Sequence, residues 1–111
     1  MQAMALHHDV AGRLQSERLR LRGHIAELND ATRPIPPDCA VGHQGRMEAL
    51  RMQAVLRTEL IAIQTRLQHV EAAINRLQRG RYGRCEHCGE AIPRERLMAC
   101  PEARRCTDCA D

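Results

Sequence analysis

A heptad run in the second half of the chain constrains its fold more than any other feature. Between Arg46 and about Arg79, apolar residues alternate at spacings of four and three without interruption: Leu56, Leu60, Ile63, Leu67, Val70, Ile74 and Leu77. This spacing places apolar side chains along one face of a helix and is typical of a helix that packs lengthwise against another helix. Met47 and Leu50 extend the stripe toward the N-terminal end of the segment. We therefore predict one long helix here.

A second amphipathic segment, residues 6–30, precedes the heptad run. Its apolar residues recur at spacings of three, four and seven: Leu6, Val10, Leu14, Leu21, Ile25 and Leu28. They form one stripe on a helix, with Arg and Glu residues on the other faces. Glu17 stands at a stripe position between Leu14 and Leu21, where a charged residue either loosens the helix pairing or fixes its register.

Residues 32–45, with the sequence TRPIPPDCAVGHQG, separate the two segments and are predicted to form a turn or tip. Their three prolines and two glycines do not continue a helix. Two helices joined by a short breaker fold back as an antiparallel hairpin, although each stripe could instead pair with another subunit. The chain has one aromatic residue, Tyr82, and no Phe or Trp, which favours long packed helices over a sandwich or barrel.

Four of the six cysteines form two C-x2-C pairs near the end of the chain. The pairs are Cys85 with Cys88 and Cys106 with Cys109, and 17 residues separate them. Two residues between thiols let both sulfurs of a pair reach one ion at about 2.3 Å, and two pairs complete a tetrahedron. The spacing predicts one structural Zn2+ bound by these four cysteines, with no open position for catalysis. Gly89 follows the first pair and lets the backbone turn its N–H groups toward the sulfurs.

The other residues of this region are predicted to have different roles. Cys100 is unpaired and is expected to be a structural or redox-responsive thiol, not a ligand, and Cys39 has no assigned role. His87 is expected to be solvated. Thiol–disulfide chemistry at the C-x2-C pairs is an alternative, but a thioredoxin-like motif follows a strand and here a heptad helix precedes it. Gly80 and Gly83 are predicted to end that helix and to supply positive φ angles.

Composition limits the possible functions. The chain does not start with a positively charged leader and an apolar run, and it contains no apolar stretch of about 18 residues, so we expect a cytoplasmic protein without membrane contact. The formal net charge of +3 falls to roughly +1 when four thiolates bind Zn2+. This low charge and the near absence of aromatic residues argue against nucleic-acid binding. No Ser/His/Asp or Cys/His arrangement indicates an enzyme.

The run GRYGRCEHCGEAIPRERLMACPEARRCTDC, residues 80–109, follows the heptad helix and resembles the DksA/TraR (DnaK-suppressor) family of bacterial zinc-finger transcription regulators. The matching features are the four cysteines with their spacing, Gly80, Tyr82–Gly83, Cys88–Gly89, Ile92–Pro93, Arg96–Leu97 and Pro101. The resemblance implies that the protein binds RNA polymerase through the secondary channel, without sequence-specific DNA binding. It also implies that the zinc finger holds the base of the hairpin while the tip approaches the active site.

The resemblance places the tip chemistry in IPPDCA, residues 35–40. Asp38 and Ala40 match the second half of the family pattern D-x-x-D-x-A, with Ile35 where the first Asp would stand. Shorter family members give a second alignment, which matches Val41–Gly42 and residues 46–50 and puts the tip acid at Pro37. Both alignments remain open.

Two departures from the family concern the alarmone ppGpp. Basic residues that help to hold ppGpp in responsive members correspond to Cys100 and Ala110 in this chain. The helix that follows the finger in those members has no counterpart before Asp111. We expect weak or absent ppGpp dependence and weaker polymerase binding.

The sequence thus predicts an all-α protein. A long antiparallel helical hairpin, or coiled coil, occupies residues 1–79 with its tip at 31–46, and a C4 zinc finger occupies residues 80–111. Two alternatives to polymerase regulation stay open. The chain could be a sequence-tolerant nucleic-acid-binding zinc protein, or a structural or redox-sensing zinc coiled-coil module.

Overall fold

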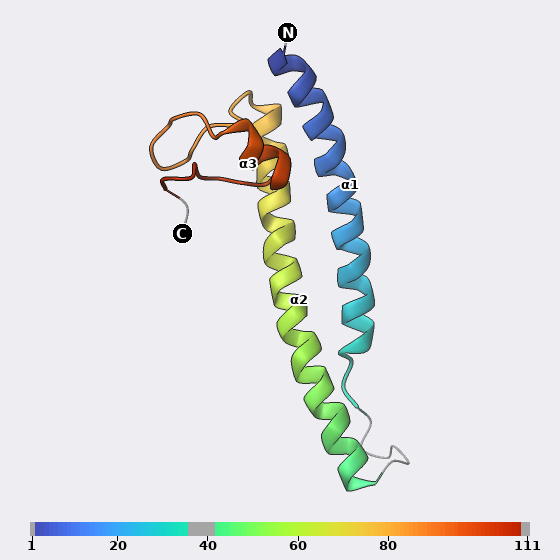
Figure 1. Cartoon of the computed structure of the whole chain (residues 1–111). Coiled ribbons are helices and arrows are strands. Elements are labelled where there is room, and N and C mark those ends of the chain that lie inside the picture. The colour runs from blue at the N-terminus through green and yellow to red at the C-terminus, as the bar shows by residue number, and fades with distance from the viewer. Residues whose placement is uncertain (1, 36–41, 110–111) are drawn as a thin grey trace.

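The protein folds into a long helical hairpin with a small C-terminal segment packed on one end (Figure 1). The structure is a computed structural model that describes residues 2–35 and 42–109, with side chains from Asp9 onward. Helix α1 spans Gln2–Ala31, α2 spans His43–Gln78 and α3 spans Arg94–Ala99. The molecule measures 63 × 26 × 20 Å. The predicted all-α class, with its long antiparallel helix pair, is confirmed.

The predicted apolar stripes form the interface between α1 and α2. The buried residues of the two helices in this interface are Val10, Leu14, Leu21, Leu28, Val70, Ala73 and Ile74. Ile63, Leu67 and Leu77 are partly buried and pack against the same cluster. The seven positions of the heptad run are therefore buried or half-buried, as the spacing predicts. Leu6, at the start of the first stripe, lies outside the described side chains.

The N-terminal part of α2 differs from the prediction. Met47 and Leu50 are 38% and 37% exposed, so they do not extend the buried stripe. The reason is the length of α1. Gln53 is buried and its side-chain N–H donates a hydrogen bond to the backbone oxygen of Arg33, just past the end of α1. Residues of α2 that precede Gln53 thus extend beyond the end of the partner helix.

Helix α2 also begins earlier than expected, at His43 instead of Arg46. Gly45, which the sequence places in the breaker, lies in the first turn of the helix. The N–H of Arg46 donates to the carbonyl oxygen of Gly42 at 2.9 Å, which closes this turn. A glycine costs a helix only about 1 kcal/mol, so the long helix that follows tolerates it.

The end of α2 follows the prediction from its glycines. Gly80 and Gly83 have φ angles of 71° and 87°. The N–H of Arg81 donates to Arg76 O at 2.8 Å and the N–H of Gly80 donates to Leu77 O at 3.2 Å. These two bonds form a Schellman motif, which satisfies the last carbonyls of the helix and turns the chain away from its axis.

The C-terminal segment shares the core of the hairpin. Tyr82, Ile92, Leu97 and Ala103 are buried in the same apolar cluster as the α1 and α2 residues near them. The hydroxyl of Tyr82 donates to the carbonyl oxygen of Pro101 at 2.8 Å. Burial raises the pKa of Tyr82 to about 12, so this donor keeps its proton. Apolar packing therefore joins the segment to the hairpin, and the Tyr82 hydrogen bond ties two parts of the segment to each other.

Candidate metal centre

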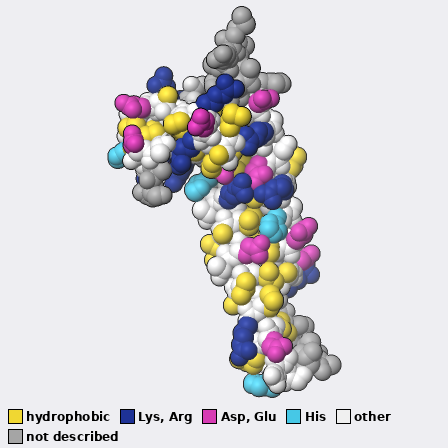
Figure 2. Space-filling view, viewed as in Figure 1, with side chains coloured by type: hydrophobic (Ala, Val, Ile, Leu, Met, Phe, Trp, Pro, Cys, Tyr) yellow, Lys and Arg dark blue, Asp and Glu magenta, His cyan; other side chains and the backbone are white. Residues whose placement is uncertain are grey.

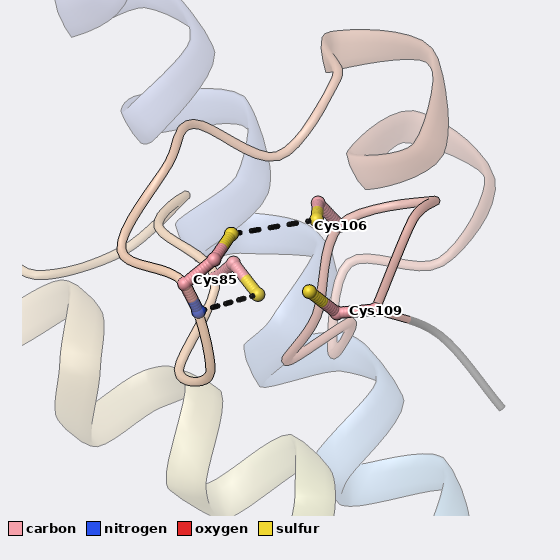
Figure 3. A group of neighbouring side chains, drawn as sticks. Cys85, Cys106 and Cys109 are labelled. Carbon is pink, nitrogen blue, oxygen red and sulfur yellow. Dashed lines mark hydrogen bonds between the residues drawn. The ribbon is translucent and has the colours of Figure 1, made fainter.

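The four paired cysteines lie together in the folded chain. The Sγ atoms of Cys85, Cys88, Cys106 and Cys109 all lie within 4.8 Å of one another. Figure 3 shows the sulfurs of Cys85, Cys106 and Cys109 turned toward one another. The sulfurs of Cys88 and Cys106 are 3.7 Å apart. Four sulfurs at about 2.3 Å from a tetrahedral Zn2+ would be about 3.8 Å apart, so the arrangement fits one ion.

Backbone turns hold each pair of cysteines in position. After the first pair, Gly89 has a φ of 77°, and its N–H donates to Cys85 O at 2.9 Å. The N–H of Cys88 points at the sulfur of Cys85 at 3.5 Å (Figure 3). In the second pair, the N–H of Cys109 donates to Cys106 O at 3.1 Å. The prediction that Gly89 allows this turn is confirmed.

Hydrogen bonds between the two pairs fix their separation. The N–H of Glu86 donates to the carbonyl oxygen of Arg104 at 2.9 Å. An isolated antiparallel bridge joins Arg84 to Ala91 and closes the loop around the first pair. One backbone hydrogen bond therefore joins the two halves of the site across the 17 intervening residues, and both halves also pack in the shared apolar core.

The thiols differ in how readily they lose a proton. Hydrogen bonding from the backbone of Cys88 lowers the pKa of Cys85 to about 6, because the N–H stabilises the thiolate. The side chain of Cys106 and burial raise the pKa of Cys109 to about 12. Without a metal, Cys85 therefore loses its proton easily, and its negative charge disfavours deprotonation of the neighbouring thiols. A divalent cation removes this repulsion, so metal binding and proton release are coupled.

The remaining residues of the predicted site lie elsewhere. Cys100 is half-buried and is not in the cysteine group, and burial followed by the charge of Glu102 raises the pKa of its thiol. His87 is exposed, as expected. The tip residues Asp38 and Ala40, together with Cys39, lie outside the described residues.

An ion-pair link between the hairpin and the C-terminal segment was not evident from the sequence. Arg66 of α2 contacts Glu17 of α1 at 2.9 Å (Nη2 to Oε1) and Glu102 of the C-terminal segment at 3.2 Å (Nε to Oε1). Hydrogen bonding from Arg20, together with the charge of Arg66, lowers the pKa of Glu17. The charged residue in the first stripe thus forms an ion pair across the two helices. The spacing signalled Glu17, whereas nothing in the sequence pointed to Glu102.

In the part of the chain that the structure describes, no helix combines the length and the apolar character that crossing a bilayer requires.

Comparisons with known proteins agree with this geometry. Residues 80–111 match the family model of the prokaryotic dksA/traR C4-type zinc finger. An uncharacterized protein of Aquifex aeolicus (strain VF5) is 44% identical over 45 residues, which are 40% of this chain and 31% of the relative. The matched part thus spans about a third of that relative's length.

The solved structure of transcription factor DksA2 from Pseudomonas aeruginosa is similar to this one. The match covers 96% of this chain and 78% of the DksA2 chain. The two share 25% sequence identity and the TM-score is 0.68. The matched finger and the four-cysteine cluster together indicate one structural Zn2+. The resemblance seen in the sequence is confirmed for the finger: residues 80–111 match the DksA/TraR C4-type zinc finger, and the fold of the chain is similar to that of a DksA-type transcription factor.

Proposed function

We propose that this protein is a cytoplasmic transcription factor that acts on RNA polymerase through the secondary channel. The observation that carries the proposal is the shape of the molecule. The C-terminal segment packs against one end of a narrow hairpin, and the end of α1 and the start of α2 lie at the opposite end (Figure 1). A rod of this form can extend a tip into an opening that excludes a compact globule.

The proposed roles divide along the length of the molecule. Cys85, Cys88, Cys106 and Cys109 ligate one Zn2+, which holds the finger in shape. The finger supports the base of the hairpin through the shared core and through Arg66. Asp38 and Ala40 then act at the tip, near the polymerase active site, where a carboxylate can alter the local electrostatics.

We propose further that the protein responds weakly or not at all to ppGpp. Cys100 occupies a position where responsive relatives carry a basic residue. A thiol is never positively charged, so the half-buried Cys100 offers no cation to a phosphate. A transcription assay with strong ppGpp synergy would contradict this part of the proposal.

A pull-down with core RNA polymerase tests the proposal directly. We expect binding at micromolar protein and displacement by another secondary-channel factor. Absence of binding, or binding that this competitor leaves unchanged, rules out the proposed route. Asp38→Asn is the finer test, because it should keep polymerase binding and lose the effect on transcription. Loss of binding in this variant would contradict the assigned role of the tip.

A further inference from the structure

A pocket of about 480 Å³ lies where α2 meets the first cysteine pair. Its lining residues are Arg76, Arg81, Arg84, Cys85, Glu86 and Gly89. The three arginines come from three consecutive features of the backbone: the last turn of α2, the Schellman motif and the bridge that precedes Cys85. The hydrogen bonds of these features fix the backbone positions of all three. The pocket is thus part of the fold and not a chance gathering of side chains on a loop.

The arginines of this pocket lack acidic partners. Among the described residues, neither Arg76, Arg81 nor Arg84 forms an ion pair within 4.0 Å. Arg76 donates to the carbonyl oxygen of Ala103 at 3.4 Å, and Arg84 donates to that of Gly89 at 3.3 Å. These carbonyl bonds orient two guanidinium groups, and Glu86 attracts Arg76 without forming an ion pair with it.

The acid of the pocket is already engaged. Glu86 contacts Arg104 at 3.6 Å and Arg105 at 3.4 Å. Arg76 is half-buried, and burial lowers its pKa because the guanidinium has lost part of its water. A partly desolvated cation beside an occupied carboxylate gains more from a new anion than a fully solvated one does.

The zinc centre does not remove the excess of positive charge. Four thiolates and one Zn2+ carry about −2. Among the residues that line the pocket or pair with its glutamate, there are one glutamate and five arginines, which are Arg76, Arg81, Arg84, Arg104 and Arg105. Figure 2 shows Arg side chains interspersed with Asp and Glu side chains over the finger-bearing part of the molecule. The pocket therefore stays positive when zinc is bound.

The chemistry of the pocket favours phosphate over a carboxylate. Guanidinium groups bind phosphate oxygens in pairs, and three of them on one pocket suit a group with several oxygens and two charges. The volume lies within the usual range for small-molecule sites. At Gly89 even an added Cβ would meet nothing within 4 Å, so the wall is open there.

We propose that this pocket binds the phosphate groups of a small anion, either a nucleotide or a free phosphate chain. The proposal does not depend on polymerase binding. Cys100, the counterpart of a ppGpp-holding residue in responsive relatives, does not line the pocket.

Calorimetric titration of the zinc-loaded full chain tests this site, with pyrophosphate and ADP as separate probes. The variants are Arg81→Gln and Arg84→Gln, which are exposed and outside the cysteine cluster. Arg51→Gln, exposed on α2, is the matched control. Wild type should bind at least one probe, and each pocket variant should weaken that binding about tenfold, as expected for loss of a charge-assisted hydrogen bond. The control should change affinity less than about twofold. Zinc content should stay at one ion per chain in all variants.

Each outcome decides the proposal. Saturable pyrophosphate binding that both pocket variants weaken supports a site for free phosphate chains, and binding of ADP alone supports a nucleotide site. Failure of both probes at millimolar concentration overturns the proposal. An equal loss in Arg51→Gln overturns it as well, because that result indicates general charge attraction. Binding of a single-stranded oligonucleotide without either probe also overturns it, in favour of a nucleic-acid surface.

Discussion

The two ends of the hairpin are held together in different ways. At the finger end, where residues 80–109 pack against α1 and α2, Leu14 and Val70 are fully buried and Arg66 links three segments. At the far end, which comprises the end of α1 and residues 43–55 of α2, Met52 and Val55 are 59% and 63% exposed. Among the described contacts there, the side chain of Gln53 connects α2 to the backbone just past the end of α1, through the oxygen of Arg33.

The two ends therefore have different roles: the finger end stabilises the fold, and the far end is available for contact with a partner. Apolar burial and, once bound, zinc concentrate the folding free energy at the finger end. The far end contributes little to that core and leaves apolar side chains on the surface of α2, some of them visible in Figure 2. Residues at the far end can therefore contact another molecule without being required for the fold. Four predictions test this division, from the largest expected effect to the smallest.

Loss of one zinc ligand should have the largest effect. Cys106→Ser removes a ligand and should abolish zinc retention, and with it up to about 10 kcal/mol of metal-linked folding free energy. Metal analysis and hydrogen exchange of residues 80–109 measure the two effects. Cys100→Ser is the matched control and should keep its zinc, because Cys100 lies outside the cysteine group. Zinc loss in the control would reverse the ligand assignment.

Acidification should weaken zinc binding steeply. The pKa of Cys85 is lowered to about 6, but the pKa values of Cys88 and Cys109 are raised, so zinc must displace at least two protons near neutral pH. Protons compete with zinc, so the metal-linked stability is present at higher pH and is lost as the pH falls. Competition titrations with a chelator should show affinity falling at least about a hundredfold per pH unit below pH 7, and more steeply below about pH 6, where Cys85 is protonated too. A slope near tenfold would mean that only one proton is displaced.

A Val→Ala substitution should lower the free energy of unfolding by different amounts at the two ends of α2. Val70→Ala removes a fully buried side chain and should lower the free energy of unfolding by about 1–3 kcal/mol. Val55→Ala, at a 63% exposed site, should change it by less than about 0.5 kcal/mol. Urea denaturation of the zinc-loaded proteins compares them. Equal costs would contradict the concentration of stability at the finger end.

Removal of the Arg66 link should have the smallest measurable effect. Arg66→Gln should cost about 1 kcal/mol, because its side chain is 44% exposed but bonds to the more buried Glu102. Arg22→Gln breaks an exposed pair with Glu71 and should cost less than about 0.5 kcal/mol. Thermal unfolding of both variants at low and high salt compares the two losses of stability. If both variants behave alike, Arg66 does not join the finger to the hairpin.

Local patterns in the sequence predicted most of the fold and the cysteine cluster. The heptad spacing identified the buried face of α2, because side chains at that spacing share one side of any helix. The C-x2-C pairs selected four cysteines, since two intervening residues limit how far apart two sulfurs can lie. Gly80 and Gly89 marked their turns because only glycine adopts positive φ without strain.

Tertiary structure alone decided the features that depend on how distant segments align. The exposure of Met47 and Leu50 follows from where α1 ends beside Gln53, which no spacing within α2 reveals. Arg66 reaches Glu102 only because the finger folds back along α2. The sequence by itself determined helices, turns and a cysteine cluster, since neighbouring residues encode them. The ion-pair link required the folded chain, because its residues come from segments that only the fold brings side by side. The arginine pocket is formed by residues 76–89, whose side chains gather on one side only through the turn that ends α2.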